Sequence, residues 1–328
     1  MKISDYLFWY SYNKRVPLYT IFEITYKCNL HCFHCYIPTD YRKKTEIETS
    51  LVKKTIARIA QLGGLYLVLT GGEPLLRDDV FEIISFAKKL NFVVILFSNG
   101  SLIDKNVAKN LKKSMVDKVE VSIYGDELLH NKFVNKEVFS KVENALKLLK
   151  KYKISFALKT VLTKKNYKGY NYIKELAEKF NVVLKTDMMV TKKLDRKEDN
   201  LNLVLDNKKI ADFIEKNNYS VKKHSKKIED LICSAGFNIV SISPQGDVYP
   251  CVVFPYSLGN IKENDFKEIW LNTNYPDLVK NLKNYKRCLS CKLVEFCRRC
   301  PGMCYVETNS LYGCSYVVRK MAKVFATL

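Results

Sequence analysis

The segment FEITYKCNLHCFHC at residues 22–35 indicates both the fold and the kind of cofactor that this chain binds. A strand-like apolar run leads directly into Cys28, Cys32 and Cys35, which are spaced C-x3-C-x2-C. Three thiolates so close in sequence can bind three corners of an iron–sulfur cubane and leave the fourth iron open. A zinc site fits less well, because zinc prefers four ligands in two separated pairs, and one of the two histidines inside the loop would have to complete it.

Short apolar runs alternate with longer amphipathic ones through the first two thirds of the chain. The predicted strands lie at 21–25, 65–70, 92–97, 118–123, 154–162 and 182–189. The predicted helices between them lie at 50–61, 78–90, 104–113, 137–152 and 169–180. This alternation predicts right-handed βαβ units and a parallel sheet. Periodicity alone leaves open whether the sheet is doubly wound or an incomplete barrel.

Both architectures place function at the carboxyl ends of the strands. The cysteine loop follows the first predicted strand, Gly71-Gly72-Glu73 follows the second, and Ser98-Asn99-Gly100 follows the third. Two adjacent glycines allow the backbone to approach a ligand closely. The carboxylate of Glu73 can accept a charge-assisted hydrogen bond from an ammonium group.

The remaining eight of the eleven cysteines all lie from Cys233 onward. An odd number of cysteines in a chain of 328 residues does not suggest a disulfide framework, so metal binding is the better expectation. The alternative to iron–sulfur clusters in this region is a pair of structural zinc ribbons.

The C-x3-C-x2-C loop after the first strand, followed one unit later by Gly-Gly-Glu-Pro, resembles the radical S-adenosylmethionine (radical SAM) superfamily over about residues 18–190. The resemblance implies a partial (β/α)6 TIM-type barrel and reductive cleavage of S-adenosylmethionine to a 5′-deoxyadenosyl radical. The open iron would bind the amino and carboxylate groups of that cofactor. The implied cofactor contacts are Gly71, Gly72, Glu73, Asn99, Ser122, Lys159 and Met188.

The later cysteines resemble the SPASM extension, a small cysteine-rich domain that holds two auxiliary [4Fe–4S] clusters. The outer auxiliary cluster would be bound by Cys288, Cys291, Cys297 and Cys314. The inner one would be bound by Cys233, Cys251 and either or both of Cys300 and Cys304. In the family, three residues commonly separate the cysteine at the position of Cys297 from a single following cysteine. Here two residues separate Cys297 from Cys300, and Cys304 is additional. We therefore expect three [4Fe–4S] clusters in total.

The expected organisation has four parts. These are an N-terminal extension at 1–17, the radical SAM core at 18–205, a bridging helix and linker at 206–230, and the auxiliary cluster domain at 231–328. A hairpin is predicted at 239–249 and a terminal helix at 316–327. Only about twenty residues precede the first strand, so a leader-peptide-binding module is expected as a separate protein if one is needed.

The resemblance implies an oxidoreductase that abstracts hydrogen from a peptide or protein substrate. The product would be a thioether crosslink, a carbon–carbon crosslink or another oxidation. Alternatives within the enzyme class are an anaerobic sulfatase-maturing oxidase and a haem-pathway decarboxylase, and the non-enzyme alternative is an electron-transfer or scaffold protein. Asp247, Tyr249 and Glu307 are candidate acceptors of the substrate proton, and none of the four histidines is expected to be catalytic.

The formal net charge is +21, but lysines are scattered through every segment. No nucleic-acid partner is expected, because the basic residues form no long block or aromatic-interleaved patch. The positive field favours an acidic electron donor such as a flavodoxin or ferredoxin. No membrane span or signal peptide is predicted, so we expect a cytoplasmic protein.

Overall fold

The computed structural model describes residues 3–197, 200–217, 219–221, 223 and 232–328. The strands are β1 (Tyr19–Thr25), β2 (Tyr66–Gly71), β3 (Val93–Ser98), β4 (Lys118–Ser122), β5 (Phe156–Val161), β6 (Leu184–Asp187), β7 (Ile239–Ile242), β8 (Asp247–Tyr249) and β9 (Gly259–Asn260). The helices of the first part are α1 (Ile3–Lys14), α2 (Thr49–Gln61), α3 (Val80–Lys89), α4 (Lys105–Lys113), α5 (Glu127–Val134), α6 (Phe139–Lys151), α7 (Tyr170–Phe180) and α8 (Asn207–Lys216). The later helices are α9 (Phe266–Asn272), α10 (Tyr275–Lys280), α11 (Lys286–Leu289), α12 (Pro301–Thr308) and α13 (Tyr316–Phe325).

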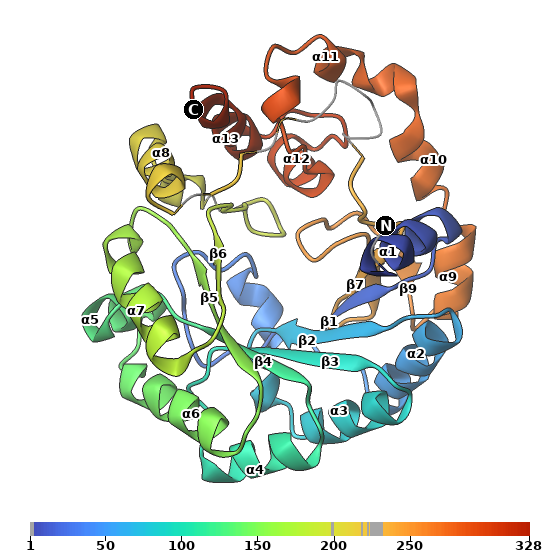
Figure 1. The fold of residues 1–328 in the computed structure, drawn as a ribbon. Helices are drawn as coiled ribbons and strands as arrows, with labels where there is room; N and C mark the ends of the chain where they lie inside the picture. The colour runs from blue at the N-terminus through green and yellow to red at the C-terminus, as the bar shows by residue number, and fades with distance from the viewer. Residues whose placement is uncertain (1–2, 198–199, 218, 222, 224–231) are drawn as a thin grey trace.

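Strand order settles the choice between the two predicted architectures. The sheet runs β6-β5-β4-β3-β2-β1-β7-β8-β9, and the first six strands are parallel neighbours in chain order. A doubly wound sheet would reverse its order at a switch point. The six strands β1–β6 show no such reversal, and this part of the sheet curves with α2, α3, α4, α6 and α7 along its outer side (Figure 1). The predicted partial (β/α)6 barrel is confirmed.

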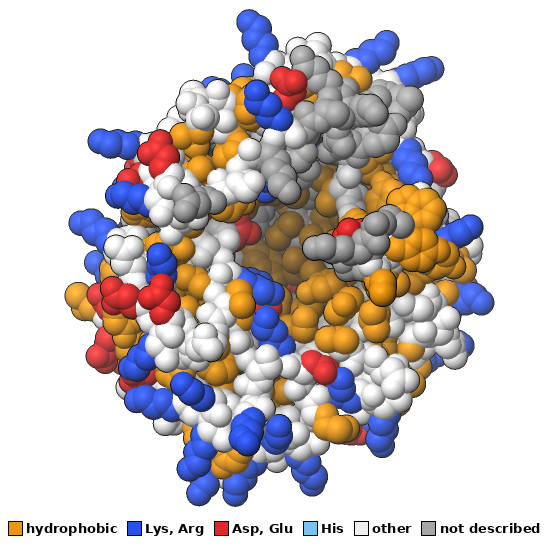
Figure 2. Space-filling model, in the orientation of Figure 1, with side chains coloured by type: hydrophobic (Ala, Val, Ile, Leu, Met, Phe, Trp, Pro, Cys, Tyr) orange, Lys and Arg blue, Asp and Glu red, His pale blue; other side chains and the backbone are white. Residues whose placement is uncertain are grey.

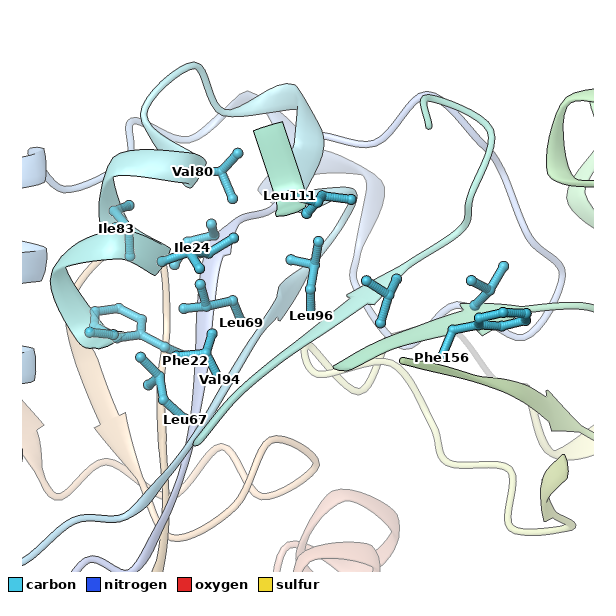
Figure 3. Close-up of a cluster of buried hydrophobic side chains, with 14 of the residues drawn as sticks. Phe22, Ile24, Leu67, Leu69, Val80, Ile83, Val94, Leu96, Leu111 and Phe156 are labelled. Carbon is cyan, nitrogen blue, oxygen red and sulfur yellow. The ribbon is translucent and has the colours of Figure 1, made fainter. Parts of the chain in front are cut away.

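Apolar and polar side chains alternate along the barrel strands, so the two faces of the sheet differ in character. Phe22 and Ile24 of β1 are fully buried and pack, with Leu67, Leu69, Val94 and Leu96, against helix residues that include Val80 and Ile83 (Figure 3). Because successive side chains of a strand point to opposite faces, the residues between these apolar ones point to the concave inner side. That inner side carries polar residues, and they include Glu23, Glu120, Ser122 and Lys159.

The C-terminal part of the chain extends the barrel sheet. β7 pairs in parallel with β1, while β8 and β9 follow in antiparallel order. The predicted hairpin at 239–249 is thus confirmed as β7 and β8. Its attachment to the free edge of β1 was not predicted, because hydrophobic periodicity carries no information on which strand becomes a neighbour. The helices α10–α13 lie across the open side of the curved sheet (Figure 1).

Two further helices, α1 and α8, pack against the C-terminal part of the chain. The N-terminal extension contains α1, which was not predicted, and Tyr12 stacks on Phe237 with ring centroids 4.6 Å apart. The helix expected near 206–217 is α8, and it packs with α13 around Phe213 and Met321. Residues 218, 222 and 224–230 of the predicted bridge lie outside the described residues. Among the helices described, none combines the length and apolar character needed to cross a bilayer.

Candidate functional site

The cysteine loop leaves β1 and lies against the end of α5. The amide of His31 donates to the carbonyl of Val134 at 3.1 Å, and the amide of Phe33 donates to the carbonyl of Phe133 at 3.1 Å. Leu30 is buried among the side chains that follow β4, together with Tyr124 and Phe133. These contacts fix a loop that has no regular secondary structure of its own. Helix α5, which was absent from the predicted elements, provides the surface on which the loop is held.

The three thiols of this loop form one electrostatic group. Burial raises the pKa of Cys28 and of Cys32, and the neighbouring thiols raise both further. Two donors point at the sulfurs: Arg42 Nη2 lies 3.9 Å from Cys35 Sγ, and Asn99 Nδ2 lies 4.0 Å from Cys28 Sγ. A loop that concentrates unpaired thiols and directs N–H groups at them fits an iron–sulfur cluster, whose thiolates are stabilised by such hydrogen bonds. Cys28, Cys32 and Cys35 are therefore the residues suited to hold one.

The Gly71-Gly72 turn packs on the strand that leads into the loop. The amide of Gly72 donates to the carbonyl of Thr25 at 2.7 Å, and the amide of Glu73 donates to that of Lys27 at 2.8 Å. A Cβ on Gly71 would overlap the carbonyl oxygen of Thr25, and one on Gly72 would overlap that of Lys27. The sequence suggested that these glycines make room for a ligand. In the structure they make room for the chain's own backbone, at Thr25 and Lys27 just before Cys28.

Glu73 is buried at the centre of the turns that follow β2 and β3. Its carboxylate accepts hydrogen bonds from the Ser98 hydroxyl at 2.9 Å and the Asn99 amide at 2.7 Å. Burial raises the pKa of Glu73 to about 7, although these hydrogen bonds act in the opposite direction. A buried carboxylate with this pKa can bind a cation and thereby recover the charge partner that it lacks in the free protein. This agrees with the role expected for Glu73 toward an ammonium group.

Of the other predicted cofactor contacts, three lie on the same side of the barrel. Asn99 joins Glu73 to the cysteine loop, because its Nδ2 also donates to Asn29 Oδ1 at 2.9 Å. Ser122 and Lys159 are register partners on β4 and β5. The Lys159 ammonium lies 3.7 Å from the centroid of the Phe97 ring and 3.9 Å from Glu120 Oε2. Burial lowers the pKa of Lys159.

Met188 is placed differently from the other predicted contacts. It is 5% exposed and packs in the cluster that joins α8 to α13, with Leu162 and Phe213 among its neighbours. Its side chain is thus part of the packing between the barrel and the C-terminal helix. The contact of Met188 with a cofactor stays a prediction.

The inner cysteine group gathers three of the later thiols. Burial raises the pKa of Cys251 to about 11 and that of Cys300 to about 12, and Cys233 raises both further. Cys300 is the N-cap of α12, and its sulfur accepts a hydrogen bond from the Met303 amide at 3.5 Å. A helix N-terminus favours the thiolate over the thiol, which suits a metal ligand.

The outer group is arranged around Cys297. Burial raises the pKa of Cys297 to about 12, and Cys288, Cys304, Cys314 and Cys291 raise it further, in that order. All of these cysteines are unpaired thiols.

Cys304 lies between the two auxiliary groups. It is 2% exposed, and besides burial its electrostatic neighbours are Arg299, Cys314 and Glu307. Cys300 has Cys233, Cys251 and Cys304 among its electrostatic neighbours. In the described part of the chain, no three His, Cys, Asp or Glu side chains converge on a single metal ion.

One buried carboxylate on the inner side of the barrel, that of Glu23, was not predicted as a site residue from the sequence. Glu23 of β1 accepts hydrogen bonds from the hydroxyls of Tyr36 at 2.7 Å and Tyr26 at 3.1 Å. Burial raises the pKa of Glu23 to about 7. Tyr36 directly follows the ligand loop. The charge of Glu23 contributes to raising the pKa of Cys251. Glu23 is therefore linked to the first cysteine group through Tyr36 and is an electrostatic neighbour of Cys251 in the inner auxiliary group.

The three candidate proton acceptors from the sequence lie in two places. Asp247 and Tyr249 are electrostatic neighbours of Tyr26, so they belong to the region around Glu23. Glu307 instead accepts hydrogen bonds from Ser315 Oγ and the Tyr316 amide, both at 2.5 Å, at the start of α13. It lines a surface cavity with Cys314, Lys192 and Arg319.

This geometry agrees with the comparisons to known proteins. A model of the radical SAM superfamily matches residues 22–180, and a model of the SPASM iron–sulfur cluster-binding domain matches residues 233–301. The chain belongs to the radical SAM superfamily. It carries a C-terminal SPASM-type domain, and together these imply iron–sulfur clusters and S-adenosylmethionine as cofactors.

Several relatives match most of this radical SAM chain. An AdoMet-dependent heme synthase of Methanosarcina barkeri is 27% identical, over 89% of this chain and 93% of the relative. An Fe-coproporphyrin III synthase of the same organism is 26% identical, over 95% and 88%. The subtilosin biosynthesis protein AlbA of Bacillus subtilis is 27% identical, over 78% of this chain and 60% of AlbA.

Solved structures share the fold. anSMEcpe with bound AdoMet superposes with a TM-score of 0.69 at 22% identity, covering 95% of this chain and 92% of that one. Streptococcus suis SuiB bound to the precursor peptide SuiA gives a TM-score of 0.70 at 16% identity, covering 96% and 80%. At these identities the likeness supports the architecture alone.

Proposed function

We propose that this radical SAM enzyme oxidises a peptide or protein substrate, removing a hydrogen atom from a side chain or a Cα and forming a thioether or carbon–carbon crosslink or another oxidised product. When bound, the cofactors supply a 5′-deoxyadenosyl radical that takes the hydrogen atom and an auxiliary cluster that accepts the electron left on the substrate. The substrate thus loses two electrons, and its proton passes to a base on the protein.

The observation that carries this proposal is that Glu23 neighbours residues of two cysteine groups. Tyr36, which donates to Glu23, lies next to Cys35, while Cys251 of the second group lies within the field of the same carboxylate. One face of the molecule is hollowed at its centre, with hydrophobic side chains on much of its floor and charged ones at its margin (Figure 2). A substrate in this hollow would lie between a site of radical formation and a site that accepts electrons.

The residues of the chain have separate tasks in this proposal. Cys28, Cys32 and Cys35 would hold the first cluster, and Glu73 would bind the ammonium group of S-adenosylmethionine. Cys233, Cys251 and Cys300 would hold the inner auxiliary cluster, and Cys288, Cys291, Cys297 and Cys314 the outer one. Support for a peptide substrate comes from AlbA, a relative that acts in the biosynthesis of the bacteriocin subtilosin.

A second candidate is the haem-pathway alternative, the oxidative decarboxylation of an iron porphyrin. Two relatives from Methanosarcina barkeri are named AdoMet-dependent heme synthase and Fe-coproporphyrin III synthase. The barrel offers ammonium donors for propionate groups: Lys159 and Lys185 both pair with the buried Glu120, yet their side chains are 36% and 44% exposed. Asp187 lies near Lys159 and offsets part of this charge.

The two candidates are separated by mass spectrometry on the anaerobically reconstituted enzyme with dithionite and S-adenosylmethionine. Peptides encoded beside its gene should lose 2 Da per crosslink or oxidation, together with formation of 5′-deoxyadenosine. Loss of carbon dioxide from iron coproporphyrin III would favour the second candidate, and Lys159→Gln with Lys185→Gln should then weaken porphyrin binding. A fully loaded protein that forms no 5′-deoxyadenosine would contradict both.

A further inference from the structure

The outer surface of the cysteine loop carries an exposed aromatic ring among positive charges. The side chain of Phe33, between two ligand cysteines, is 41% exposed, and its ring meets Phe133 edge-on at 6.0 Å. The Lys165 ammonium lies 5.4 Å from the centroid of the Phe33 ring. We call the surface formed by His31, Phe33, Arg42, Lys136 and Lys165 the Phe33 face.

Two further cations are anchored to the backbone of the loop. Arg42 Nη1 donates to the carbonyl of Leu30 at 2.6 Å and lies 3.3 Å from His31 Nδ1. Lys136 Nζ donates to the carbonyl of Asn29 at 3.2 Å. Arg42 also reaches the sulfur of Cys35, so one side chain joins this surface to a thiol of the loop.

The charge of the Phe33 face is largely uncompensated. Among the ion pairs of the described residues, none involves Arg42, Lys136 or Lys165. The nearby acid Glu137 instead accepts a hydrogen bond from Asn131 at 2.6 Å. Unpaired cations around an exposed aromatic ring are typical of a surface that binds an acidic protein partner, with the ring as anchor and the charges steering association.

We infer that the Phe33 face is the docking site for an acidic, low-potential one-electron carrier protein. This inference rests on the proposed function, which requires one electron per cleavage of S-adenosylmethionine. In this step the carrier would lose one electron and the cluster that Cys28, Cys32 and Cys35 would hold would gain it, with no bond made or broken. Of the two residues between Cys32 and Cys35, Phe33 is the exposed one. A carrier bound at the Phe33 face would therefore be close to the thiols of the loop.

The test measures binding and electron delivery separately. The probe is an acidic flavodoxin, and its association with the reconstituted enzyme is followed by fluorescence anisotropy at 50 mM and 500 mM NaCl. Lys165→Glu and Phe33→Ala are the test variants. Lys136 and Arg42 are left unchanged because both support the loop backbone. At 50 mM salt each variant should bind the flavodoxin about three- to tenfold more weakly, and the effect of Lys165→Glu should largely vanish at 500 mM.

A matched control separates a local site from the overall charge of +21. Lys151→Glu changes the net charge equally, but Lys151 is exposed at the carboxyl end of α6, at the opposite end of the sheet from the ligand loop. Its flavodoxin binding should match that of the unmodified enzyme. Equal weakening by Lys165→Glu and Lys151→Glu would overturn the docking site.

Turnover with two reductants distinguishes the docking site from the proposed function. Formation of 5′-deoxyadenosine driven by flavodoxin should fall in the Lys165→Glu and Phe33→Ala variants, whereas turnover driven by dithionite, a small reductant, should fall much less. Parallel losses with both reductants would overturn the docking inference and leave the radical chemistry standing. Absence of 5′-deoxyadenosine in the unmodified enzyme with dithionite would instead contradict the proposed function, while the anisotropy result would still report on docking.

Discussion

The carboxylate of Glu73 accepts the backbone amide of Asn99 at 2.7 Å, and this hydrogen bond ties the turn after β2 to the turn after β3. Asn99 continues the connection, because its side chain reaches Asn29 and the sulfur of Cys28. Three loops that are separate in sequence thus form one structure around a buried negative charge. A ligand with an ammonium group that binds Glu73 would lie close to the open corner of the cluster.

Glu73→Gln should weaken binding of S-adenosylmethionine by about ten- to a hundredfold. A glutamine keeps the shape of the side chain but removes the charge that pairs with the ammonium group. Ser98 and Asn99 donate to different oxygens of Glu73, and glutamine has one oxygen, so it accepts one of these two hydrogen bonds and not both. Isothermal titration of the reconstituted enzyme measures this change. Glu82→Gln on the surface of α3 is the control and should bind like the unmodified enzyme. Unchanged affinity in Glu73→Gln would show that the ammonium group binds elsewhere.

The binding of S-adenosylmethionine should also depend on pH through Glu73. Burial raises the pKa of Glu73 to about 7, so below pH 7 the carboxyl group must lose a proton before it can pair with a cation. Affinity should therefore rise between pH 6 and pH 8, by up to about tenfold per pH unit on the acidic side. The same titration in Glu73→Gln should show a flatter profile, and identical slopes would assign the pH dependence to another group.

Gly71→Ala should destabilise the protein by about 4 kcal/mol or more, because the new Cβ meets the backbone of Thr25 and neither segment can move without disturbing β1. The matched control is Gly63→Ala. Gly63 also has a positive φ, of 88°, but its Cβ would meet only the side chain of Val16, at 3.0 Å. The control should lose about 1–2 kcal/mol. Urea unfolding of both variants measures the difference, and equal losses would mean that backbone conformation alone requires glycine at residue 71.

The sequence predicted much of this site because its motifs are short and follow strands. The alternation of 3.6-residue and 2-residue periods located the six barrel strands, and the ends of parallel strands then had to meet at one edge. The partial barrel itself came from the family resemblance, and the strand order confirmed it. The reason for Gly71 and Gly72 was not predictable, since the backbone that they approach lies about 45 residues earlier in the chain.

Glu23 could not be identified from the sequence for a similar reason. In the run 21–25 it is one polar residue of an alternating strand, and such residues are usually solvent-exposed. Its importance depends on the hydroxyl of Tyr36, thirteen residues later, and on Cys251, which reaches the same region only because β7 pairs with β1. Helix α1 was missed because its aromatic residues are distributed around the helix and show no apolar stripe.

Cys300 should be required for the inner auxiliary cluster, and Cys304 should not. Cys300 has Cys233 and Cys251 as neighbours, whereas Cys304 has Cys314 and Arg299. Iron and sulfide analysis after anaerobic reconstitution should find about four fewer irons per chain in Cys300→Ala than in the unmodified protein. Cys304→Ala removes a buried thiol of small volume and should keep the full iron content. A loss of four irons in Cys304→Ala, with none in Cys300→Ala, would reverse the assignment.

Glu23→Gln should make the stability of the cluster-free protein less dependent on pH. Burial raises the pKa of Glu23 to about 7, above the ordinary value of 4.5 that it regains on unfolding. The folded state therefore holds this proton more tightly, so its contribution to stability is complete below pH 4.5 and is lost as the pH rises through about 7. At pH 8 ionisation of this group lowers the stability of the unmodified protein by up to about 3 kcal/mol relative to pH 4.5, and the substitution by glutamine removes that loss.

Urea unfolding at pH 5 and pH 8, with reductant to keep the thiols free, measures the free energy of unfolding of the variant and of the unmodified protein. The contributions of the other titrating groups cancel in the difference between the two proteins. Tyr36→Phe is the companion variant, because it removes a hydrogen bond that lowers the pKa of Glu23 and should steepen the loss of stability. A constant difference between Glu23→Gln and the unmodified protein at the two pH values would show that Glu23 is already ionised in the fold at pH 5.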